Sequence, residues 1–272
     1  KFSVIVVDNA SKNPFVLPKH LKESQFEVVR SETNLGFTGG NNLGIHYAIE
    51  KYNSEYVCLL NSDTYVDKHF LEHLYDCART SPQAGLFSPL IYFAEGYEYH
   101  SDSYTPEERG RVIWYAGGSI DWRNLYSFHR GVDEVDRGQF DAQDSSEFAT
   151  GCCVLISREV LETVGLFDPA YFLYLEDVDL SIRAQRRGYA LTFCPQAKVW
   201  HKNAGSTGGA GSDLHQYYQS RNRVWFSLKY GNWRTRLVAL KLAFQLFFQG
   251  QPIEKRAMMD LSIGRLGKQP IL

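Results

Sequence analysis

The stretch "LLNSDT", residues 59–64, is the end of an apolar run that stops abruptly in polar residues. Residues 56–60 are typical of a buried strand, so Asp63 falls at the end of that strand. An ionised carboxylate buried without a partner is unfavourable, and a divalent cation carrying a diphosphate would supply that partner. The sequence Asn-Ser-Asp-Thr also has good turn chemistry, which by itself favours a simple turn. The rest of the chain therefore decides between a turn and a metal site.

The composition is that of an ordinary globular protein. The chain has 272 residues, of which 44% are hydrophobic and 22% charged, and one large domain is the simplest expectation. The formal net charge is -2, which gives no reason to expect a nucleic acid or another acidic polymer as a partner. The first residues do not have the pattern of a signal peptide, and no apolar run reaches the roughly 18 residues of a membrane span.

The cysteines do not have the spacing of a disulfide framework or a zinc site. There are 5 of them, most lie within apolar runs, and no C-x-x-C pair occurs. This usage predicts buried, reduced thiols and therefore a cytosolic compartment. The cysteines are Cys58, Cys77, Cys152, Cys153 and Cys194.

Strand-like and helix-like segments alternate in the first part of the chain. Residues 2–7 form an apolar run that ends in Asp8 and Asn9, and residues 26–30 form a second strand-like segment. Residues 45–52 are typical of a helix, and another helix is expected to begin with Asp67 as its N-cap. This alternation predicts an α/β sheet with parallel strands and right-handed crossovers. Ligands of such sheets bind beyond the carboxyl ends of the strands, where Asp8 and Asp63 both fall.

The middle of the chain contains a polar excursion followed by shorter elements. Residues 94–111 are polar and irregular, and strand-like segments follow at 112–115 and 148–156. Helices are expected at 158–164 and 176–187, and short strands at 191–194 and 198–200, the second of which ends in His201. The glycine-rich segment "NAGSTGGAGSD" is of the kind that closes over a ligand.

The C-terminal part, from residue 214, is predicted to form two helices. In the second, Lys241, Gln245 and Gln249 make one narrow polar stripe, and apolar residues cover the remaining surface. So broad an apolar face must be covered. It packs on the domain or on a partner, or it lies in a membrane interface beside Arg234 and Arg236.

A second acidic cluster begins the helix predicted at 176–187. Carboxylates in the first turn of a helix favour the positive end of its dipole, and Asp179 is placed for an ion pair with Arg183. This reading is purely structural. However, Glu176 and Asp177 directly follow the apolar "FLYL", and partial desolvation raises the pKa of a carboxyl group toward general-base use.

Two further motifs bear on ligand binding. His201 ends a strand and, beside Asp63, would complete a site for a hard cation such as Mg²⁺ or Mn²⁺, although a lone histidine is usually structural. The glycines of "GFTGGNNLG" have the wrong spacing for a G-x-G-x-x-G dinucleotide motif, and no Walker lysine follows them. They still permit a close approach of backbone to a ligand.

Taken together, these motifs resemble a family 2 glycosyltransferase of the GT-A fold, and most of all its bacterial rhamnosyltransferase-type members. The matching segments are "VIVVDNAS", "NLGFTGGNNLG", "LLNSDT", "GCCVLISREVLETVGLFDPAYFLYLEDVDLSIRAQRRGY" and "VWH" before "GST". They occur in the order of the family, from residue 4 to about residue 223. The resemblance implies an α/β GT-A domain with a mixed sheet over residues 1–212 and a C-terminal helical extension over 213–272.

The resemblance also implies a reaction. It is the inverting transfer of a sugar, L-rhamnose among the options, from a dTDP- or UDP-sugar to a glycan or lipid-linked acceptor of cell-surface polysaccharide synthesis. Asp177 would be the general base with Glu176 beside it, and Asp63 and His201 would hold Mg²⁺ or Mn²⁺. The expected nucleotide-binding residues are Asp8, Asn9, Asn34, Gly36, Gly40, Asn41 and Asn61, and those facing acceptor or phosphate are Arg221 and Asn222.

The chain departs from the family pattern in two places. Family members usually have another strand and helix before "VIVVDNAS", and Asn61 stands where many relatives carry an aspartate. Two other functions share parts of this logic: a binding domain without catalysis, and a sugar nucleotidyltransferase, which would release pyrophosphate rather than a nucleoside diphosphate. The expected location is the cytoplasm, with peripheral contact to the inner face of the membrane through residues 234–249.

Overall fold

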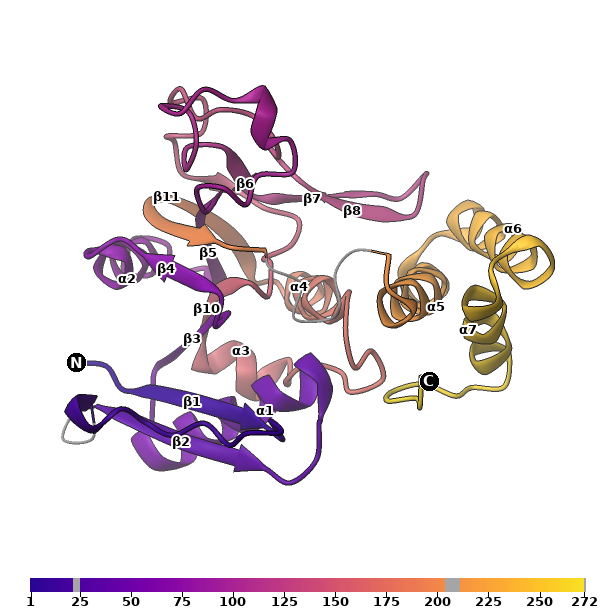
Figure 1. Ribbon diagram of the computed structural model, residues 1–272, viewed down its shortest axis with the longest axis horizontal. Coiled ribbons are helices and arrows are strands. Elements are labelled where there is room, and N and C mark those ends of the chain that lie inside the picture. The colour runs from indigo at the N-terminus through magenta and orange to yellow at the C-terminus, as the bar shows by residue number, and fades with distance from the viewer. Residues whose placement is uncertain (22–24, 204–210, 272) are drawn as a thin grey trace.

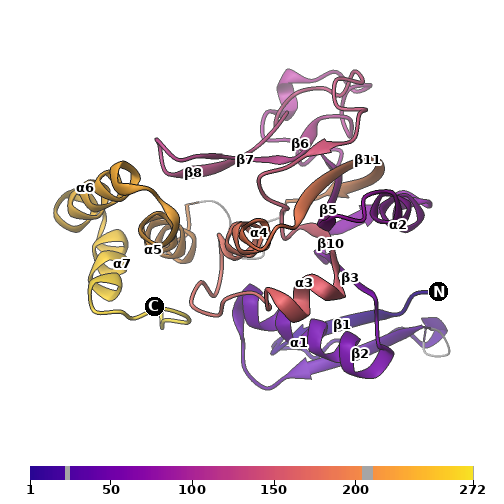
Figure 2. The ribbon, with the colours of Figure 1, turned by 180° about the vertical axis from the view of Figure 1, so that it is seen from behind.

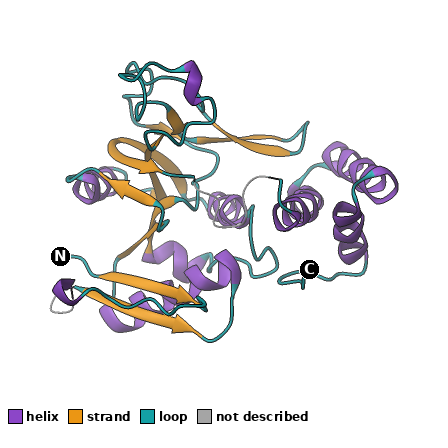
Figure 3. Cartoon of the chain, viewed as in Figure 1, coloured by secondary structure: helices purple, strands orange, loops and turns teal. Residues whose placement is uncertain are grey.

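A computed structural model describes residues 1–21, 25–203 and 211–271 of the chain (Figure 1). Most of the glycine-rich segment that was expected to close over a ligand, residues 204–210, lies outside the described residues. The chain forms a central mixed sheet with helices beside it, a smaller sheet near the N-terminus, and a group of helices at the C-terminus (Figures 1 and 3).

The central sheet has 7 strands, with the order β3-β10-β5-β11-β4, β6 on β5 and β9 on β11. β10 runs antiparallel to both β3 and β5, whereas β11 runs parallel to β5, so that β3, β5 and β11 point the same way. The strands are β3 (Tyr56–Leu60), β4 (Thr64–Val66), β5 (Ala84–Phe93), β6 (Ile113–Tyr115), β9 (Asp144–Ser145), β10 (Cys153–Ser157) and β11 (Ala190–His201).

The prediction of parallel strands is correct for β3, β5 and β11 but wrong for β10 and β4. The excursion after β5 leaves and re-enters the sheet at the same edge, so β10 must run back along the sheet. Only residues 61–63 connect β3 to β4. A connection this short allows the chain to reverse its direction, but it is too short for the crossover that joins parallel strands. The two short strands predicted at 191–194 and 198–200 are one strand, β11, with an irregularity between Cys194 and Lys198.

The centre of the sheet is β5, whose residues are all buried. Its apolar sequence is that of a strand covered on both faces, although it was not among the segments predicted. α2 (Phe70–Thr80), α3 (Arg158–Thr163) and α4 (Glu176–Arg186) pack on the central sheet. The main core includes Leu74, Phe87, Ile91, Cys153 and Val199.

A second sheet consists of the parallel strands β1 (Val4–Asn9) and β2 (Phe26–Ser31), and the connection between them contains a short 3-10 helix, η1 (Lys19–Leu21). It lies below β3 in Figure 1 and is covered by α1 (Gly36–Tyr52). Ile45 and Ala48 of α1 are buried in a cluster with Val57 and Leu59 of β3, which ties the two sheets together. The helix predicted from residue 45 therefore begins earlier, at Gly36.

The excursion between β5 and β10 has structure of its own. It contains the 3-10 helix η2 (Ser101–Ser103), β6, and a hairpin of β7 (Gly118–Asp121) and β8 (Tyr126–His129). The buried carboxylate of Glu98 accepts hydrogen bonds from the backbone N–H groups of Gly96 at 2.8 Å and Gly110 at 2.9 Å. These bonds hold the irregular part of the excursion together.

The C-terminal part consists of three helices rather than the two predicted: α5 (Asp213–Tyr230), α6 (Trp233–Gln249) and α7 (Pro252–Ser262). Gly250 follows the last residue of α6, and Pro252 is the first residue of α7. Glycine after a helix and proline at the start of the next are typical signals of a helix boundary, which the prediction missed. The helices pack around a small core of Tyr217, Tyr218 and Met258, at the side of the molecule away from β3 (Figures 1 and 2). No helix within the described ranges is long and apolar enough to cross a membrane.

Helix α2 begins at Phe70, not with Asp67 as its N-cap. The residue before the helix is His69, and the carboxylate of Asp67 accepts a hydrogen bond from the His69 N–H at 2.8 Å. Asp67 therefore organises the turn before the helix. Local polar sequence signals of this kind locate a helix terminus only to within a few residues.

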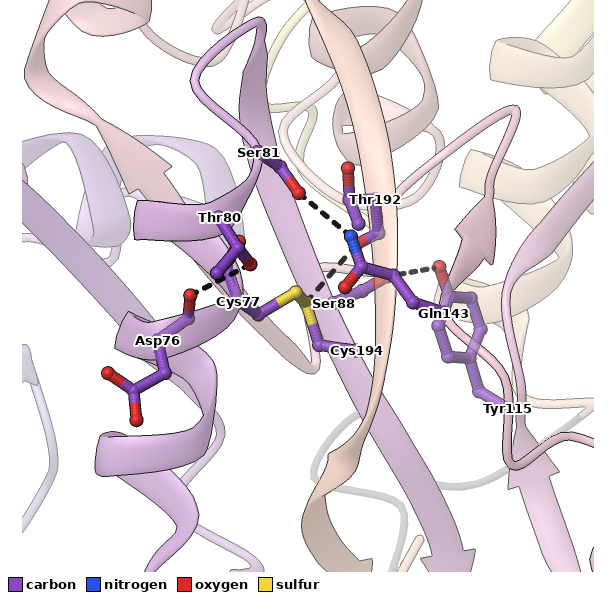
Figure 4. The surroundings of a disulfide bond; sticks show 9 residues. All are labelled: Asp76, Cys77, Thr80, Ser81, Ser88, Tyr115, Gln143, Thr192 and Cys194. Atoms are coloured by element: carbon purple, nitrogen blue, oxygen red, sulfur yellow. Dashed lines mark hydrogen bonds between the residues drawn. A yellow bond between two sulfur atoms is a disulfide. The ribbon is translucent and has the colours of Figure 1, made fainter.

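The prediction of reduced cysteines is wrong for two of them, because Cys77 and Cys194 form a disulfide (Figure 4). Their Cα atoms are 6.1 Å apart, within the range that a disulfide spans. The partners are separated by 117 residues, so no local spacing signals the bond. It joins α2 to β11, while Cys58, Cys152 and Cys153 remain free. The expectation of a cytosolic compartment loses the support that it took from reduced thiols.

We expect the disulfide to stabilise the fold, because it closes a long loop in the unfolded chain. Reduction, or Cys77→Ser with Cys194→Ser, should lower the free energy of unfolding by about 2–4 kcal/mol. Urea unfolding with and without reductant measures this change. As a control, thiol labelling of the denatured protein should modify the 3 free cysteines before reduction and all 5 afterwards. Labelling of all five without reduction would contradict the disulfide.

Candidate active site

The site lies at the edge of the central sheet where β3 and β11 both end. β4 pairs antiparallel with β11, and its register places Thr64 opposite His201. Asp63, the residue before β4, is thereby brought beside His201, and its Oδ1 lies 3.2 Å from the Nε2 atom of that histidine. The backbone N–H of Lys202 also donates to the Asp63 carbonyl oxygen at 2.9 Å. The structure thus brings together the two predicted metal ligands.

His201 is held against an aromatic wall. Its side chain is buried, and its ring lies edge-on to Trp114 with 4.7 Å between the ring centroids. Trp114 in turn contacts the ring of His129 at 4.3 Å, and the Nδ1 atom of His129 is 2.9 Å from the Trp114 carbonyl oxygen. Burial lowers the pKa of His129 to about 4, so this ring is neutral at neutral pH. The wall fixes the orientation of the His201 imidazole.

The Asp63 and His201 side chains suit a divalent cation that is also bound by the phosphate oxygens of a ligand. Within residues 1–21, 25–203 and 211–271, no group of three or more His, Cys, Asp or Glu is placed to bind a metal by itself. The Nδ1 atom of His201 is buried and has no hydrogen-bond partner among the described residues. One carboxylate and one imidazole suit Mg²⁺ or Mn²⁺, provided that phosphate oxygens and water fill the other positions.

The predicted general base lies at the start of α4. The Asp177 carboxylate accepts hydrogen bonds from the backbone N–H groups of Gly151 and Val178, both at 2.8 Å. Burial raises the pKa of Asp177 even though these bonds favour the charged form. Glu176 is also buried, and its Oε2 atom has no hydrogen-bond partner among the described residues. Burial, and then the charge of Asp177, raise the pKa of Glu176 well above its ordinary value.

The third carboxylate of the acidic cluster, Asp179, has a structural role. It forms the predicted ion pair with Arg183, at 2.7 Å, and a second ion pair with Lys229, also at 2.7 Å. Burial by itself would raise the pKa of Asp179, but hydrogen bonds from Lys229 and Tyr230 and the charge of Arg183 lower it. The purely structural interpretation of the acidic cluster therefore applies to Asp179. The pKa values of Glu176 and Asp177 are instead raised, as expected of a functional pair.

Cys152 connects the metal side and the base side of the site. Burial, followed by the negative charges of Asp63 and Asp177, raises the pKa of its thiol. The N–H of Asn61 donates to the Cys152 carbonyl oxygen at 2.9 Å. Because β10 runs antiparallel to β3, its first residues meet the last residues of β3, and Gly151 reaches Asp177 from there. Residues 151–152 thus contact both the segment that leads to Asp63 and the Asp177 carboxylate.

The predicted nucleotide side is organised around Asn9, at the end of β1. The Oδ1 atom of Asn9 accepts from the Leu35 N–H at 2.8 Å, and its Nδ2 group donates to the Gly36 carbonyl oxygen at 2.9 Å. A Cβ atom on Gly40 would lie 3.1 Å from Asn9 Nδ2, so glycine permits this close packing. The side chain of Asn34 accepts from the Gly36 N–H at 2.8 Å. These residues set the loop that leads into α1.

Gly36 is required by the backbone at the start of α1. Its φ angle is +71°, and a Cβ atom would lie 2.4 Å from the Phe172 ring.

The remaining predicted residues of the nucleotide side, Asn41 and Asn61, also make local hydrogen bonds. The Asn41 side chain donates to the Phe37 carbonyl oxygen at 2.8 Å, and the carbonyl oxygen of Asn61 accepts from the Thr64 hydroxyl at 2.6 Å.

Asp8 is already engaged by protein donors. Its carboxylate accepts from the N–H groups of Ser11 at 2.9 Å and Phe15 at 3.0 Å, and it forms an ion pair with Arg30. The hydrogen bonds from Ser11 and Phe15 lower the pKa of Asp8, so the group is charged at neutral pH. Asp8 thus holds the loop after β1, and a nucleobase N–H that binds Asp8 would have to share the carboxylate oxygen atoms with these donors.

Arg221 and Asn222 do not face a phosphate or an acceptor as the resemblance implied. Both side chains are fully buried, and their nitrogen atoms donate to the backbone carbonyl oxygens of residues 170, 171, 173, 174 and 267, while Arg221 Nε also donates to the side-chain oxygen of Asn222. The correction has a simple reason. A basic motif on a helix predicts charge, but only the packing of that helix decides whether the charge points to solvent or to the protein.

Several residues of the site were not predicted from sequence. The backbone N–H of Gly151 is a donor to Asp177, and Trp114 and His129 form the wall behind His201. Lys268, near the end of the chain, donates to the Asn34 carbonyl oxygen at 2.8 Å. Nothing in the sequence indicates that the Gly151 N–H or the Lys268 side chain belongs to the site. The aromatic residues within 114–129 are a signal that could have pointed to the wall.

Comparison with known proteins identifies the family. The sequence model described as "Glycosyltransferase like family 2" matches residues 19–227, which is most of the chain. The chain belongs to glycosyltransferase family 2. The fold agrees with this assignment, because it is the GT-A arrangement expected from the sequence, a central mixed sheet flanked by helices.

Curated relatives in family 2 include hexosyltransferases and rhamnosyltransferases. The low-salt glycan biosynthesis hexosyltransferase Agl10 of Haloferax volcanii is 27% identical over 219 residues, 80% of this chain and 65% of Agl10. The N-acetylglucosaminyl-diphospho-decaprenol L-rhamnosyltransferase of Mycobacterium tuberculosis is 26% identical over 86% of this chain and 78% of its own length. The dTDP-rhamnosyl transferase RfbF of Shigella flexneri is 24% identical over 80% of this chain and 68% of RfbF.

A solved structure shows the same fold in a distant glycosyltransferase. GalNAc-T7, crystallised with UDP, GalNAc and Mn²⁺, superimposes with a TM-score of 0.53 at 16% sequence identity. The superposition covers 96% of this chain and 51% of GalNAc-T7, so the chain spans about half of that protein.

The raised pKa of Glu176 predicts a stability change with pH. Between the ordinary carboxyl pKa of about 4 and the raised value, the folded state binds more protons than the unfolded state, so stability falls as pH rises. Glu176→Gln cannot ionise and should escape this loss. Its stability relative to the native protein should therefore increase between pH 5 and pH 8, as measured by urea unfolding.

Asp179→Asn serves as the control for this prediction, because the pKa of Asp179 is lowered and its charge is paired. Its folded form is stabilised by the ionised carboxylate, so this variant should lose more stability at pH 8 than in strong acid. A difference between Glu176→Gln and the native protein that does not change with pH would contradict the raised pKa of Glu176.

Proposed function

We propose that this chain is an inverting, metal-dependent glycosyltransferase. It moves a sugar, L-rhamnose among the options, from a dTDP- or UDP-sugar to a glycan or lipid-linked acceptor of cell-surface polysaccharide synthesis. The observation that supports this most directly is the position of residues 151–152: the Gly151 N–H donates to the Asp177 carboxylate, and the Cys152 carbonyl oxygen accepts from the N–H of Asn61, two residues before Asp63. It brings the proposed cation-binding pair and a partly buried carboxyl group of raised pKa to one end of the sheet.

In the proposed reaction, the acceptor hydroxyl attacks the anomeric carbon of the donor sugar. Its oxygen forms the new glycosidic bond, the bond from the anomeric carbon to the diphosphate breaks, and the nucleoside diphosphate leaves with the bonding electron pair. Asp177 accepts the proton of the hydroxyl, and a base on the face opposite the leaving group accounts for inversion. Mg²⁺ or Mn²⁺ held by Asp63 and His201 would stabilise the negative charge that develops on the diphosphate.

Glu176 supports the base without sharing its role. Two adjacent carboxyl groups that are shielded from water do not both ionise readily. Two backbone N–H groups donate to the Asp177 carboxylate, whereas the Oε2 atom of the buried Glu176 has no hydrogen-bond partner among the described residues. Glu176 is therefore the group that holds a proton, which leaves Asp177 free to ionise. The N–H groups of Gly151 and Val178 then orient the charged Asp177 carboxylate.

On the nucleotide side, the proposed residues mainly shape the pocket. Asp8 and Asn9 hold the loops that follow β1 and precede α1. Glycines at the start of α1 let the backbone come close to a ligand, as helix N-termini do with phosphate groups. The set consists of Asp8, Asn9, Asn34, Gly36, Gly40, Asn41 and Asn61.

The choice of donor and acceptor rests on the relatives. The Mycobacterium tuberculosis relative is named for an acceptor linked to diphospho-decaprenol, and the Shigella flexneri relative for dTDP-rhamnose transfer. The GalNAc-T7 structure contains UDP and Mn²⁺. These names support a thymidine or uridine nucleotide, a divalent cation and a lipid-linked acceptor for the chain described here.

We further propose that the outer face of α6 contacts an anionic membrane surface. Trp233, Leu237, Leu240 and Phe244 lie on this face at helical spacing, and they are between 54% and 66% exposed. The opposite face packs on α5 and α7. Three basic residues accompany the apolar face, and the sequence 233–249 contains no Asp or Glu. Apolar and basic side chains together match an interface rich in acidic lipids. The basic residues are Arg234, Arg236 and Lys241.

Asp177→Asn tests the catalytic proposal. This change keeps the size of the side chain but removes its ability to accept a proton, so transfer should fall roughly 10²- to 10⁴-fold. Nucleotide affinity should stay largely intact. Product analysis after incubation with dTDP- and UDP-sugars measures the transfer and the nucleoside diphosphate released.

The exposed Asp76 provides a matched control, because Asp76→Asn changes the same chemical group on the helix α2. It should leave transfer unchanged. Unchanged turnover in Asp177→Asn would remove Asp177 from the mechanism. Release of pyrophosphate would identify a nucleotidyltransferase instead, and nucleotide binding without turnover of any donor would identify a binding domain.

Vesicle co-sedimentation tests the membrane contact. The chain should bind vesicles of phosphatidylcholine and phosphatidylglycerol, and bind pure phosphatidylcholine less. Phe244→Ser with Phe248→Ser should weaken binding about 10-fold or more, because each phenylalanine buries apolar area worth roughly 1.5–3 kcal/mol. The control is Tyr75→Ser, which removes an exposed aromatic side chain from α2. Absence of binding to the anionic vesicles would contradict the proposal.

A further inference from the structure

The turn that leads into α4 has an unusual backbone. Phe172, Tyr174 and Leu175 have φ angles of +64°, +70° and +68°. Residues with side chains rarely adopt this left-handed conformation, and it persists only where the surrounding structure supports it. Leu175 is also the residue that precedes the first residue of α4, and Glu176 and Asp177 follow it directly. The direction of the two acidic side chains therefore depends on how this turn is held.

One side-chain amide, that of Asn222 on α5, serves most of the turn. Its Nδ2 group donates to the carbonyl oxygens of Tyr171 at 3.0 Å, Leu173 at 2.7 Å and Tyr174 at 3.0 Å. Its position on a long helix, with no exposed surface, fixes this donor relative to the core. This donor supplies hydrogen bonds to backbone carbonyl groups of the turn, which makes no regular pattern of backbone hydrogen bonds within itself.

Arg221 completes the support from the same helix. Its Nη2 group donates to the carbonyl oxygens of Ala170 and Tyr171, both at 3.0 Å. Its Nε group donates to the Oδ1 atom of Asn222 at 3.0 Å, which turns the amide so that its Nδ2 group faces the turn. Nη1 donates to the Gly267 carbonyl oxygen at 2.8 Å and so ties in the C-terminal segment. The guanidinium is fully buried and cannot reach a substrate.

The remaining carbonyl group of the turn is bound by α1. The Phe172 carbonyl oxygen accepts from the N–H groups of Phe37 at 2.9 Å and Thr38 at 3.3 Å. Every carbonyl group from residue 170 to residue 174 thus accepts a hydrogen bond from a residue outside the turn. The turn is held from two sides, by α5 and by the start of α1.

We propose that Arg221 and Asn222 are positioning residues, which hold the left-handed turn 172–175 and thereby aim the Asp177 carboxylate at its reacting position. This inference rests on the proposed role of Asp177 as the general base. If the support were lost, the turn would relax toward ordinary φ angles and the first turn of α4 would rotate. Asp177 would then lose its 2.8 Å hydrogen bond from Gly151. A displacement of about 1 Å at a reacting group can cost on the order of 10²-fold in rate.

Asn222→Asp tests this role, because it keeps the shape of the side chain and replaces the donating amide by an acceptor. We expect kcat to fall about 10²-fold while KM for the donor changes less than about twofold, since the nucleotide side is untouched. Hydrogen–deuterium exchange provides a readout without turnover. The amides of Gly151 and Val178, which donate to Asp177, should exchange faster in the variant.

Arg223→Lys is the matched control, on the same helix α5. It removes the fork of donors to the carbonyl oxygens of Asn124 at 2.6 Å and Leu125 at 2.8 Å, which lie outside the turn. It should lower the unfolding temperature but leave kcat and the two amides unchanged. Arg221→Lys provides a second test if Asn222→Asp does not fold. It keeps the positive charge, loses the fork of donors, and should also lower kcat with little change in KM.

The outcomes separate this inference from the proposed function. Unchanged kcat and unchanged exchange in folded Asn222→Asp or Arg221→Lys, measured well below the unfolding temperature, would overturn the positioning role. Full turnover in Asp177→Asn would instead overturn the proposed base. Faster exchange at Gly151 in Asn222→Asp would still establish the support of the turn in that case, because this measurement does not depend on catalysis.

Discussion

The reversal of β10 within the central sheet is the constraint on which the site depends. β3, β5 and β11 run in one direction, and their carboxyl ends meet at one edge. Because β10 runs the other way between β3 and β5, its first residues arrive at that same edge. Asp63 and His201 therefore come from strand ends, whereas Gly151 and Cys152 come from a strand start. An all-parallel sheet would place residues 150–152 at the opposite end of the strands, away from Asp177, to which the Gly151 N–H donates.

The charges of the site follow from how well each carboxylate is compensated. Asp179 has two cations and two hydroxyl groups around it, which keep it charged and make it part of the core. Neither Asp177 nor Glu176 has an ion pair among the described residues: the Gly151 and Val178 N–H groups donate to Asp177, and the Glu176 Oε2 atom has no hydrogen-bond partner there. Burial therefore raises the pKa of both groups. Three carboxylates within four residues thus take on different roles.

The C-terminal helices contribute to the site as well as to the surface. α5 holds the turn before α4 through Arg221 and Asn222, and Lys229 on the same helix pairs with Asp168 and Asp179 on either side of that turn. α6, in contrast, turns much of its apolar surface outward. A membrane contact made through α6 would therefore be only one helix away from the element that positions the proposed base.

The sequence alone determined the strand–helix alternation, the polar strand ends and the pair of apolar-flanked carboxylates, because these depend on neighbours within a few residues. Such patterns predicted a site that contains Asp63, His201 and Asp177; the structure places Asp63 beside His201, and burial raises the pKa of Asp177. Only the tertiary structure decided that Cys77 bonds Cys194, that β10 is reversed, and that Arg221 points into the protein. Each of these depends on how distant segments pack and in which register. That information is spread over the whole chain and is not carried by any one motif.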